Sequence, residues 1–346
     1  MDFAANRPSL FPAWGALALA AVAGTAHAGF LYGRLTLQGG EADASSRAVD
    51  VSADGRTVVF SSDSQMWVGD TYNGTRALAV DFDTGTVEAI SVGQSGVFRG
   101  EVPVVSGDGR YVAFLTYSSA YGPNWQALRR DRQTGALDVA SSDASGQPAS
   151  GGTNDNTVSI SADGRYVSFQ SSSPDLPSAQ ASRMGGGVVP AGSSGEIYVK
   201  DMVSGQVKVA SLKSDGSSSG GACAMLPHAL SATGRYLTML CGPAMVTGAS
   251  SGQAYVRDLQ ANTTELISRS ASVPNGSTAF ANRPAISPNG RFVSFQMRGY
   301  GGLGYANGVD SSGNSGVYIR DRQTGTTTPI PRPTSTTACS RTSACR

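Results

Sequence analysis

The chain has 346 residues, and its 26 basic and 25 acidic side chains leave a formal net charge of only +1. Charged residues make up 15% of the chain, and such a low, balanced charge excludes the strongly basic surface typical of a nucleic-acid-binding protein. The 44 glycines indicate many tight turns between short strands.

The N-terminal segment has the features of a secretory signal peptide. Arg7 precedes a short apolar run at residues 14–23, and Ala26-His27-Ala28 forms a small-x-small cleavage site. We therefore predict a signal peptide at residues 1–28, a mature chain from Gly29, and a periplasmic or secreted location. The alternative is an uncleaved membrane anchor, but a spanning helix needs about 20 apolar residues. No other segment is apolar enough to cross a membrane.

One motif recurs five times along the chain. Each copy has a short apolar run ending in Ser, then a turn with Gly at a fixed place, then Arg and an alternating apolar segment. The copies are Val51–Ser62, Val105–Thr116, Ile160–Ser171, Leu230–Cys241 and Ile286–Met297. Asp, Asn or Thr precedes the Gly, as a turn with a left-handed residue requires. Alternation with a period of two predicts half-buried strands, so each copy is expected to be a β-hairpin.

A second motif follows each hairpin and indicates another strand–turn–strand unit. It begins with a recurrent Asp and ends in Gly or Asn, and short apolar segments flank it. The recurrent aspartates are Asp81, Asp131, Asp201, Asp258 and Asp321. We predict that they are turn residues that accept hydrogen bonds from their own backbone. The recurrent arginines of the first motif are predicted to brace the turns; they are Arg56, Arg110, Arg165, Arg235 and Arg291.

The spacing of the two motifs predicts the architecture. Successive turn glycines are about 55 residues apart, except for one interval of about 70 that contains a Pro-, Gly- and Ser-rich insertion at 171–195. Four strands repeated at this period are typical of a β-propeller blade. We predict an all-β, five-bladed β-propeller at residues 29–333, built from four-stranded antiparallel blades. The blades are expected at about 47–98, 99–152, 153–220, 221–278 and 279–330.

The two ends of the propeller are expected to meet. Residues 30–37 (FLYGRLTL) resemble the fourth strands, whereas residues 326–333 contain three prolines and are predicted to be a poor strand. We therefore expect the strand at 30–37 to complete the last blade and to close the ring. Residues 334–346 are then a C-terminal tail.

The four cysteines are interpreted as disulfide candidates, because the compartments that exported proteins reach are oxidising. Cys223 and Cys241 lie nearly symmetrically about the turn at residues 232–234 and are expected to face one another across two strands. Cys339 and Cys345 could close a small loop in the tail. The alternative is two buried free thiols and a loose tail.

The motifs resemble those of a known group. S-x-D-G-R-Y-V-x-F followed by Y-V-x-D-x-x-T-G is similar to the WD40-like repeats of TolB-like propellers, and Asp70-Thr71-Tyr72-Asn73-Gly74 resembles their D-T-N-G loop with one residue inserted. The resemblance covers about residues 30–330. It implies an exported bacterial propeller of the cell envelope.

Binding residues are expected in the variable loops between second and third strands, which gather on one face of a propeller. The aromatic residues in or beside these loops are Trp67, Tyr72, Tyr117, Tyr121, Trp125, Tyr300 and Tyr305. Exposed together, they form a contact surface for an envelope or extracellular protein or a glycan. The alternative is that several fold back to cap the blades. We expect a monomeric, non-enzymatic binding or scaffold module that does not bind nucleic acid.

Catalytic and cofactor motifs are sparse. The chain has two histidines, and His27 leaves with the signal peptide, so only His228 remains, which we expect on a first strand. We predict no catalytic residues, no metal site and no cofactor; calcium, held by loop carboxylates such as Asp63 and Asp70, is the one metal considered. The alternative function is a glycan hydrolase or lyase with carboxylates at the central channel, because such chemistry needs no histidine. Its candidate acids are Asp50 and Asp155.

Overall fold

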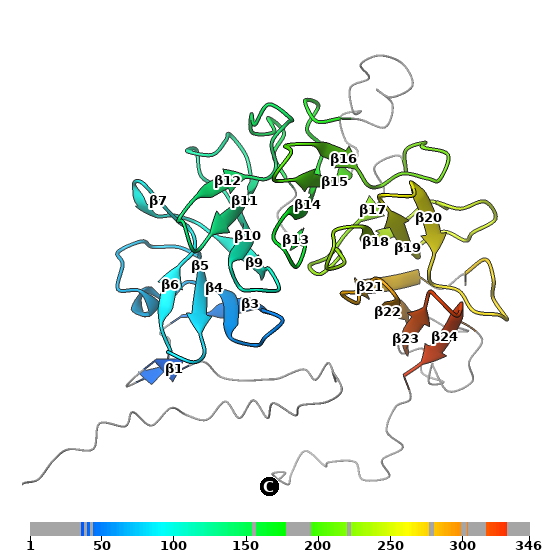
Figure 1. Cartoon of the computed structure of the whole chain (residues 1–346), viewed down its shortest axis with the longest axis horizontal. Helices are drawn as coiled ribbons and strands as arrows, with labels where there is room; N and C mark the ends of the chain where they lie inside the picture. Colours follow the sequence, from blue (N-terminus) through cyan, green and yellow to red (C-terminus); the bar gives the residue numbers. More distant parts are fainter. Residues whose placement is uncertain are drawn as a thin grey trace, which may run out of the picture.

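The computed structural model describes residues 36–37, 40–41, 44–153, 157–177, 195–219, 223–276, 280–298, 303 and 316–330. These residues form five four-stranded antiparallel sheets, which follow one another in chain order around a common centre (Figure 1). The first strands lie nearest that centre and the fourth strands lie outside; β9 contacts the first strands β3 and β13 of the sheets on either side. The arrangement is that of propeller blades.

The strands have the following bounds. The first sheet contains β3 (Ser46–Val51), β4 (Thr57–Ser62), β5 (Arg76–Asp81) and β6 (Val87–Ala89). The second contains β9 (Glu101–Val105), β10 (Tyr111–Thr116), β11 (Gln126–Asp131) and β12 (Leu137–Val139). The third contains β13 (Val158–Ile160), β14 (Tyr166–Ser171), β15 (Glu196–Asp201) and β16 (Val207–Val209). The fourth contains β17 (Cys223–Ala224), β18 (Tyr236–Cys241), β19 (Gln253–Asp258) and β20 (Thr263–Leu266). The fifth contains β21 (Phe280–Ile286), β22 (Phe292–Arg298), β23 (Gly316–Asp321) and β24 (Thr326–Pro329).

Two short two-stranded sheets and one 3-10 helix lie outside these five sheets. β1 (Thr36–Leu37) pairs with β2 (Gly40–Glu41), and β7 (Val92–Gly93) pairs with β8 (Gly96–Val97) in the connection between the first two sheets. A 3-10 helix, η1 (Gln65–Trp67), follows β4. Within the described residues, no helix combines the length and the hydropathy needed to cross a bilayer.

The turn between first and second strands is built by the repeated motif itself. In the second sheet, the Ser106 hydroxyl donates to Asp108 and accepts from the Tyr111 amide, while Asp108 accepts from the Arg110 amide. Gly109 has a φ of 75°, which glycine adopts without steric cost. The five motif glycines all have positive φ, as the sequence predicted.

The recurrent Arg and Asp residues join the two turns at the same end of each sheet. The ion-paired atoms are 2.7 Å apart in Arg110–Asp131, Arg165–Asp201, Arg235–Asp258 and Arg291–Asp321. In the first sheet, Arg56 pairs instead with Asp83. The recurrent aspartates also accept hydrogen bonds from the backbone amides that follow them. Both predicted structural roles are therefore confirmed.

Neighbouring sheets are also linked through their turns. Backbone hydrogen bonds of 2.8–2.9 Å run from Ala53 to Gly107, from Gly107 to Ala162, from Ala162 to Ala232 and from Ala232 to Pro288. Proline has no backbone N–H, so Pro288 cannot donate the next bond of this series. Any contact between the fifth and first sheets therefore has to use other groups.

Apolar side chains fill the spaces between consecutive sheets. Phe169 and Tyr198 of the third sheet stack at 5.6 Å and belong to one core cluster with Val104 and Leu115 of the second. The face of the fifth sheet that points away from the fourth sheet is less well covered, since Val317 and Ile319 are 42% and 37% exposed. At the matching register of the fourth sheet, Ala254 and Val256 are buried against the fifth sheet.

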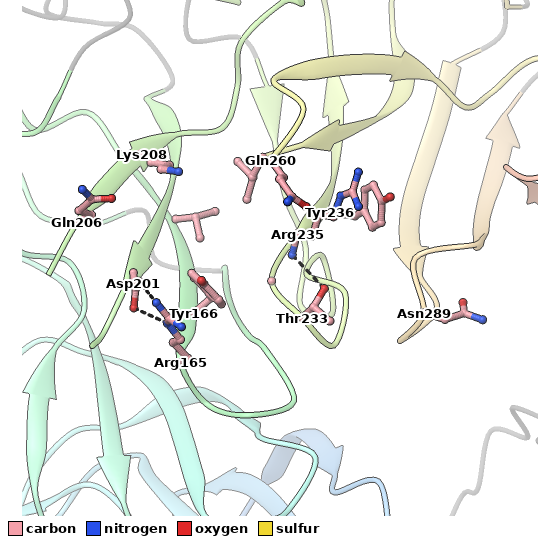
Figure 2. A pocket seen from close by; sticks show the side chains of 13 residues that line it. Arg165, Tyr166, Asp201, Gln206, Lys208, Thr233, Arg235, Tyr236, Gln260 and Asn289 are labelled. Atoms are coloured by element: carbon pink, nitrogen blue, oxygen red, sulfur yellow. Dashed lines mark hydrogen bonds and ion pairs between the residues drawn. The ribbon is translucent and has the colours of Figure 1, made fainter. Parts of the chain in front are cut away.

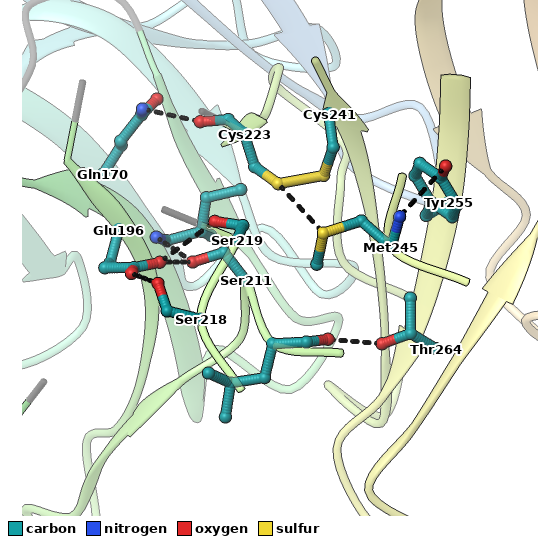
Figure 3. Close-up of a disulfide and its surroundings, with 12 residues drawn as sticks. Gln170, Glu196, Ser211, Ser218, Ser219, Cys223, Cys241, Met245, Tyr255 and Thr264 are labelled. Atoms are coloured by element: carbon teal, nitrogen blue, oxygen red, sulfur yellow. Dashed lines mark hydrogen bonds between the residues drawn. A yellow bond between two sulfur atoms is a disulfide. The ribbon is translucent and has the colours of Figure 1, made fainter. Parts of the chain in front are cut away.

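The predicted bridge between Cys223 and Cys241 is present, with an S–S distance of 2.03 Å (Figure 3). The two residues are direct cross-strand partners in β17 and β18, and both are buried. Cys223 Sγ also lies 3.9 Å from the sulfur of Met245. Cys339 and Cys345 lie outside the described residues.

Two expectations about strands need correction. Thr326–Pro329 is not a poor strand but the fourth strand of the fifth sheet, because its three threonines precede the first proline and suit a strand. His228 is not on a first strand; β17 ends at Ala224, and His228 lies in a turn with a φ of 64°. Of the predicted closing strand at 30–37, only Thr36 and Leu37 are described. They pair with β2, and β24 itself takes the fourth position of the fifth sheet.

Candidate functional site

Two of the predicted aromatic residues lie together at one end of the second sheet. Tyr117 directly follows β10 and Trp125 directly precedes β11, so they extend the cross-strand pairing of Thr116 with Gln126 by one residue. Their ring centroids are 5.9 Å apart, and the rings are tilted by 57°. Tyr117 is 54% exposed, which makes it one of the most exposed aromatic side chains of the described residues.

An ion pair lies beside these rings. Arg99 donates from Nε and Nη2 to Glu101 Oε1, at 2.8 and 2.6 Å. The Arg99 guanidinium also lies over the Trp125 ring, 4.7 Å from its centroid. The Arg99 carbonyl accepts from the Thr116 hydroxyl, which fixes the backbone at this point. The ring and the ion pair therefore hold each other in place.

Tyr72 is the third predicted aromatic residue near this ion pair. It lies in the loop between β4 and β5, half-buried, and burial raises the pKa of its hydroxyl. The charges of Arg99 and Arg76 act on the Tyr72 pKa in the opposite direction. The Arg76 guanidinium lies over the Tyr72 ring, 5.6 Å from its centroid. We call Tyr72, Arg99, Glu101, Tyr117 and Trp125 the aromatic patch.

Two of the other predicted aromatic residues, Trp67 and Tyr121, do not join the aromatic patch. Trp67 is a correction, because it is only 7% exposed, packs edge-on against Phe60 and donates from its indole nitrogen to Ser62. Tyr121 is half-buried and packs against Phe98 at 5.1 Å, so it caps the core between the first two sheets. Tyr300 and Tyr305 lie outside the described residues.

Arg99 and Glu101 were missed by the sequence analysis. Both are outside the repeated motifs: Arg99 lies in the connection from the first sheet to the second, and Glu101 is the first residue of β9. An Arg-Gly-Glu sequence where a first strand begins is a weak signal, because single charges at such places are usually solvated. Only the packing of this connection against Trp125 brings them to the aromatic patch.

A second polar group joins Asp50 of the first strand β3 to His228 in the turn that follows β17. The Asp50 carboxylate accepts from the backbone amides of Val51 and Val105, at 2.7 and 2.8 Å. His228 Nε2 lies 3.6 Å from Asp50 Oδ1, and the histidine side chain is 55% exposed. Burial raises the pKa of Asp50, and the nearby His228 charge partly opposes this shift. Asp155, the other candidate acid, lies outside the described residues.

The loop carboxylates considered for calcium are held by protein groups. Asp63 accepts from Thr75, Ser45 and Arg47, and Asp70 pairs with Arg76 at 3.0 Å. Within the described ranges, no group of three or more His, Cys, Asp or Glu side chains is arranged to hold a metal ion.

No protein-family model and no curated protein sequence matches the chain. Solved structures with a similar fold include TolB from Acinetobacter baumannii, at 19% sequence identity and a TM-score of 0.48, with 84% of this chain and 55% of that chain covered. The putative TolB from Agrobacterium tumefaciens has 13% identity and a TM-score of 0.47, with 83% and 80% covered. An oligogalacturonate lyase in complex with manganese has 10% identity and a TM-score of 0.48, with 81% and 63% covered.

This chain therefore spans 55% of the length of the Acinetobacter protein. TolB proteins are among the structures that the fold resembles, as the repeated motifs predicted.

Proposed function

We propose that this protein is an exported, non-enzymatic binding module that recognises a partner protein through the aromatic patch. The observation that carries the proposal is the exposed Tyr117 ring beside a Trp125 ring held by Arg99. Tyr, Trp and Arg are the residue types that contribute most to protein–protein binding energy. Rigid aromatic side chains lose little entropy on binding, so such a patch suits a protein interface.

A protein partner fits the aromatic patch better than a glycan does. A sugar ring usually binds by stacking on a free aromatic face, but the Arg99 guanidinium already lies over the Trp125 ring. Arg99 and Glu101 together provide both donors and acceptors beside the rings, which matches the polar rim of a protein interface. A glycan partner is therefore the second choice and is tested below.

We further propose that the five sheets are the blades of a closed five-bladed propeller. The exposed Val317 and Ile319 support this proposal, because a covering surface would remove apolar area from water. The part of the predicted closing strand that precedes β1 would add beside β24, whose outer edge has no strand partner among the described residues. Deleting residues 29–35 should then increase amide hydrogen exchange in β24 and leave β12 unchanged. Equal exchange in β24 of both proteins would contradict closure by this segment.

Export is also part of the proposal. The signal sequence predicts it, and the Cys223–Cys241 bridge suits an oxidising compartment. N-terminal sequencing of the protein from a cell-envelope fraction should find Gly29 as its first residue. An intact N-terminus in the cytoplasmic fraction would contradict export.

The binding proposal is tested with the exposed ring removed. Tyr117→Ala should weaken capture of envelope proteins by the immobilised mature protein about tenfold or more, as truncating a central aromatic anchor does. Val203→Ala is the matched control, because Val203 is 76% exposed but lies in the turn between β15 and β16 at the opposite ends of the strands.

Two outcomes separate the alternatives. Equal capture by the Tyr117 and Val203 variants would contradict a site at the aromatic patch. Retention of purified envelope glycans by the wild type, lost in the Tyr117 variant, would favour the glycan partner.

The enzymatic alternative depends on Asp50. Its buried carboxylate beside His228 is the one observation that favours it, since raised pKa values are common at catalytic acids. If the protein cleaves glycans, Asp50→Asn should abolish cleavage. If Asp50 is structural, the variant should keep the binding behaviour of the wild type.

A further inference from the structure

At the end of the strands that carries the turns, one arginine spans the boundary between the fourth and fifth sheets. Arg322 donates from Nε to Glu265 of β20 at 2.9 Å and from Nη1 to the carbonyl oxygen of the turn residue Gly290 at 2.5 Å. Its guanidinium lies over the Tyr236 ring, 4.3 Å from the centroid. Arg322 therefore joins a carboxylate of one sheet to the turn of the next across an aromatic ring.

The two earlier boundaries contain the same set of groups. Between the first and second sheets, Arg132 pairs with Glu88 and donates to the Gly109 carbonyl at 2.6 Å. Between the second and third sheets, Arg129 pairs with Asp138 at 2.9 Å and donates to the Gly164 carbonyl at 2.8 Å. Three of the four consecutive sheet boundaries among the described residues thus contain the same three groups, namely an arginine, a carboxylate on a fourth strand and a carbonyl of a turn.

The boundary between the third and fourth sheets differs at each of these positions. The residue that matches Arg322 is Leu259, and the residue that matches Arg129 is Val199. The fourth-strand position of Glu88, Asp138 and Glu265 is occupied by Lys208, opposite Val199 in the ladder. Lys208 has no hydrogen bond or ion pair with any residue that the structure describes.

A groove of about 810 Å³ lies at this boundary (Figure 2). Tyr166, Val199, Leu259 and Tyr236 form its apolar part, and Lys208 of β16 also lines it. Such a volume is within the range of ligand sites in proteins. The groove is at the ends of the strands that carry the first-to-second-strand turns, opposite to the aromatic patch.

The charges of the groove are unbalanced. Arg165 is paired with Asp201 through Nε and Nη2, and Arg235 is paired with Asp258 in the same way. These pairs are neutral overall, so Lys208 adds one positive charge without a carboxylate partner. An anionic group beside Lys208 would supply the partner that the other boundaries contain within the chain.

The polar lining indicates the kind of ligand that carries this anion. Gln206, Gln260 and Asn289 come from the third, fourth and fifth sheets, so the groove continues past the single lysine. Side-chain amides both donate and accept, as peptide groups do. An acidic side chain places its methylene groups over Val199 and Leu259 while its backbone reaches these amides.

We propose that the groove between the third and fourth sheets binds an acidic peptide segment, with a carboxylate of the peptide on Lys208. The site is separate from the aromatic patch, and it does not depend on the function proposed for that patch. The internal repeats also provide a control, because Arg322 and Glu265 occupy the equivalent positions at the boundary between the fourth and fifth sheets.

The lysine content of the chain makes a direct test possible. Among the 26 basic residues only Lys200, Lys208 and Lys213 are lysines. Lys200 is buried and donates to the Asp143 carbonyl, and Lys213 does not line the groove. Reductive methylation with carbon-13 keeps the lysine charge and gives one NMR signal for each accessible lysine. Titration with an acetylated, amidated tetraglutamate peptide should shift the Lys208 signal to saturation and leave the Lys213 signal in place.

Variants of the groove test the same site by fluorescence anisotropy of a labelled tetraglutamate peptide. Lys208→Gln should weaken binding about tenfold, the effect of one charge-assisted contact, while Lys213→Gln should bind like the wild type. The double variant Lys208→Glu with Leu259→Arg rebuilds the groups of the fourth–fifth boundary and should abolish binding with an unchanged or raised Tm. This variant fills the groove with the same groups that the protein uses at the boundary between the fourth and fifth sheets. The Tm therefore distinguishes a loss of binding from a loss of folding.

Three results would overturn the proposal. The first is an equal shift of the Lys208 and Lys213 signals, which indicates general charge screening. The second is an equal Lys208 shift with acetate at the same carboxylate concentration, which indicates a free anion instead of a peptide. The third is wild-type affinity in the double variant.

Discussion

The disulfide between Cys223 and Cys241 should stabilise the fourth sheet by about 3 kcal/mol. The two residues are 18 positions apart, and the loop-closure model assigns about 3 kcal/mol to a closed loop of this size. The stabilisation has a specific place in the fold. β17 contains only Cys223 and Ala224, whereas β21 of the fifth sheet contains seven residues. The bridge therefore holds a first strand that has few ladder hydrogen bonds of its own.

Urea unfolding of the oxidised and reduced wild type measures the cross-link directly. Reduction should lower the free energy of unfolding by about 3 kcal/mol with little change in the native fold. The double variant Cys223→Ala with Cys241→Ala should be less stable still, because both sulfur atoms are buried and their removal leaves a cavity beside Met245. Coincident transitions from fluorescence and circular dichroism are needed for a two-state value.

Hydrogen exchange shows whether the effect is local. Sheets that contact only their neighbours transmit stability mainly to the adjacent sheets. Reduction should therefore increase exchange most in β17 and β18, and much less in the second sheet. A change below about 0.5 kcal/mol, or an increase in exchange spread evenly over all sheets, would refute the reasoning, since the loop-closure model predicts about 3 kcal/mol.

Three further predictions follow from single residues. Gly290→Ala should lower the free energy of unfolding in urea by about 2–4 kcal/mol, because φ is 72° and a Cβ would lie 2.3 Å from the Tyr236 ring. The control Gly216→Ala, with a φ of 77° and no atom within 4 Å of the Cβ, should lower it by only about 1 kcal/mol. Equal losses in the two variants would contradict the packing argument. The Arg291 guanidinium holds the pKa of Asp321 below its usual range. This pair therefore stabilises the fold above about pH 4, and its contribution is lost as the pH falls further. A urea midpoint that does not change between about pH 5 and pH 2.5 would contradict this. Burial raises the pKa of Asp50, so Asp50→Asn should raise Tm at pH 7 and give no gain at pH 3; a lower Tm at pH 7 would show that the charge is needed there.

The sequence by itself determined the repeating unit. Gly109 and its equivalents were placed correctly because a left-handed turn residue is a local requirement, set by steric contacts within a few residues. The pairing of Cys223 with Cys241 was found for a related reason, since equal distances from a turn place two residues opposite each other in a hairpin. The strand at Thr326–Pro329 was misjudged because the prolines were counted over the segment as a whole, although the first of them ends the strand.

Tertiary structure alone decided which side chains are available for binding. Trp67 and Tyr117 both lie in or beside second-to-third-strand loops, yet one is buried against Phe60 and the other is exposed. The sequence cannot separate them, because exposure depends on which residues of other segments cover each ring. The same holds for Lys208: its ladder position can be counted from the repeats, but the missing arginine partner becomes visible only where two sheets meet. Local geometry repeats with the motif, whereas the contacts between blades depend on side chains that differ from one copy to the next.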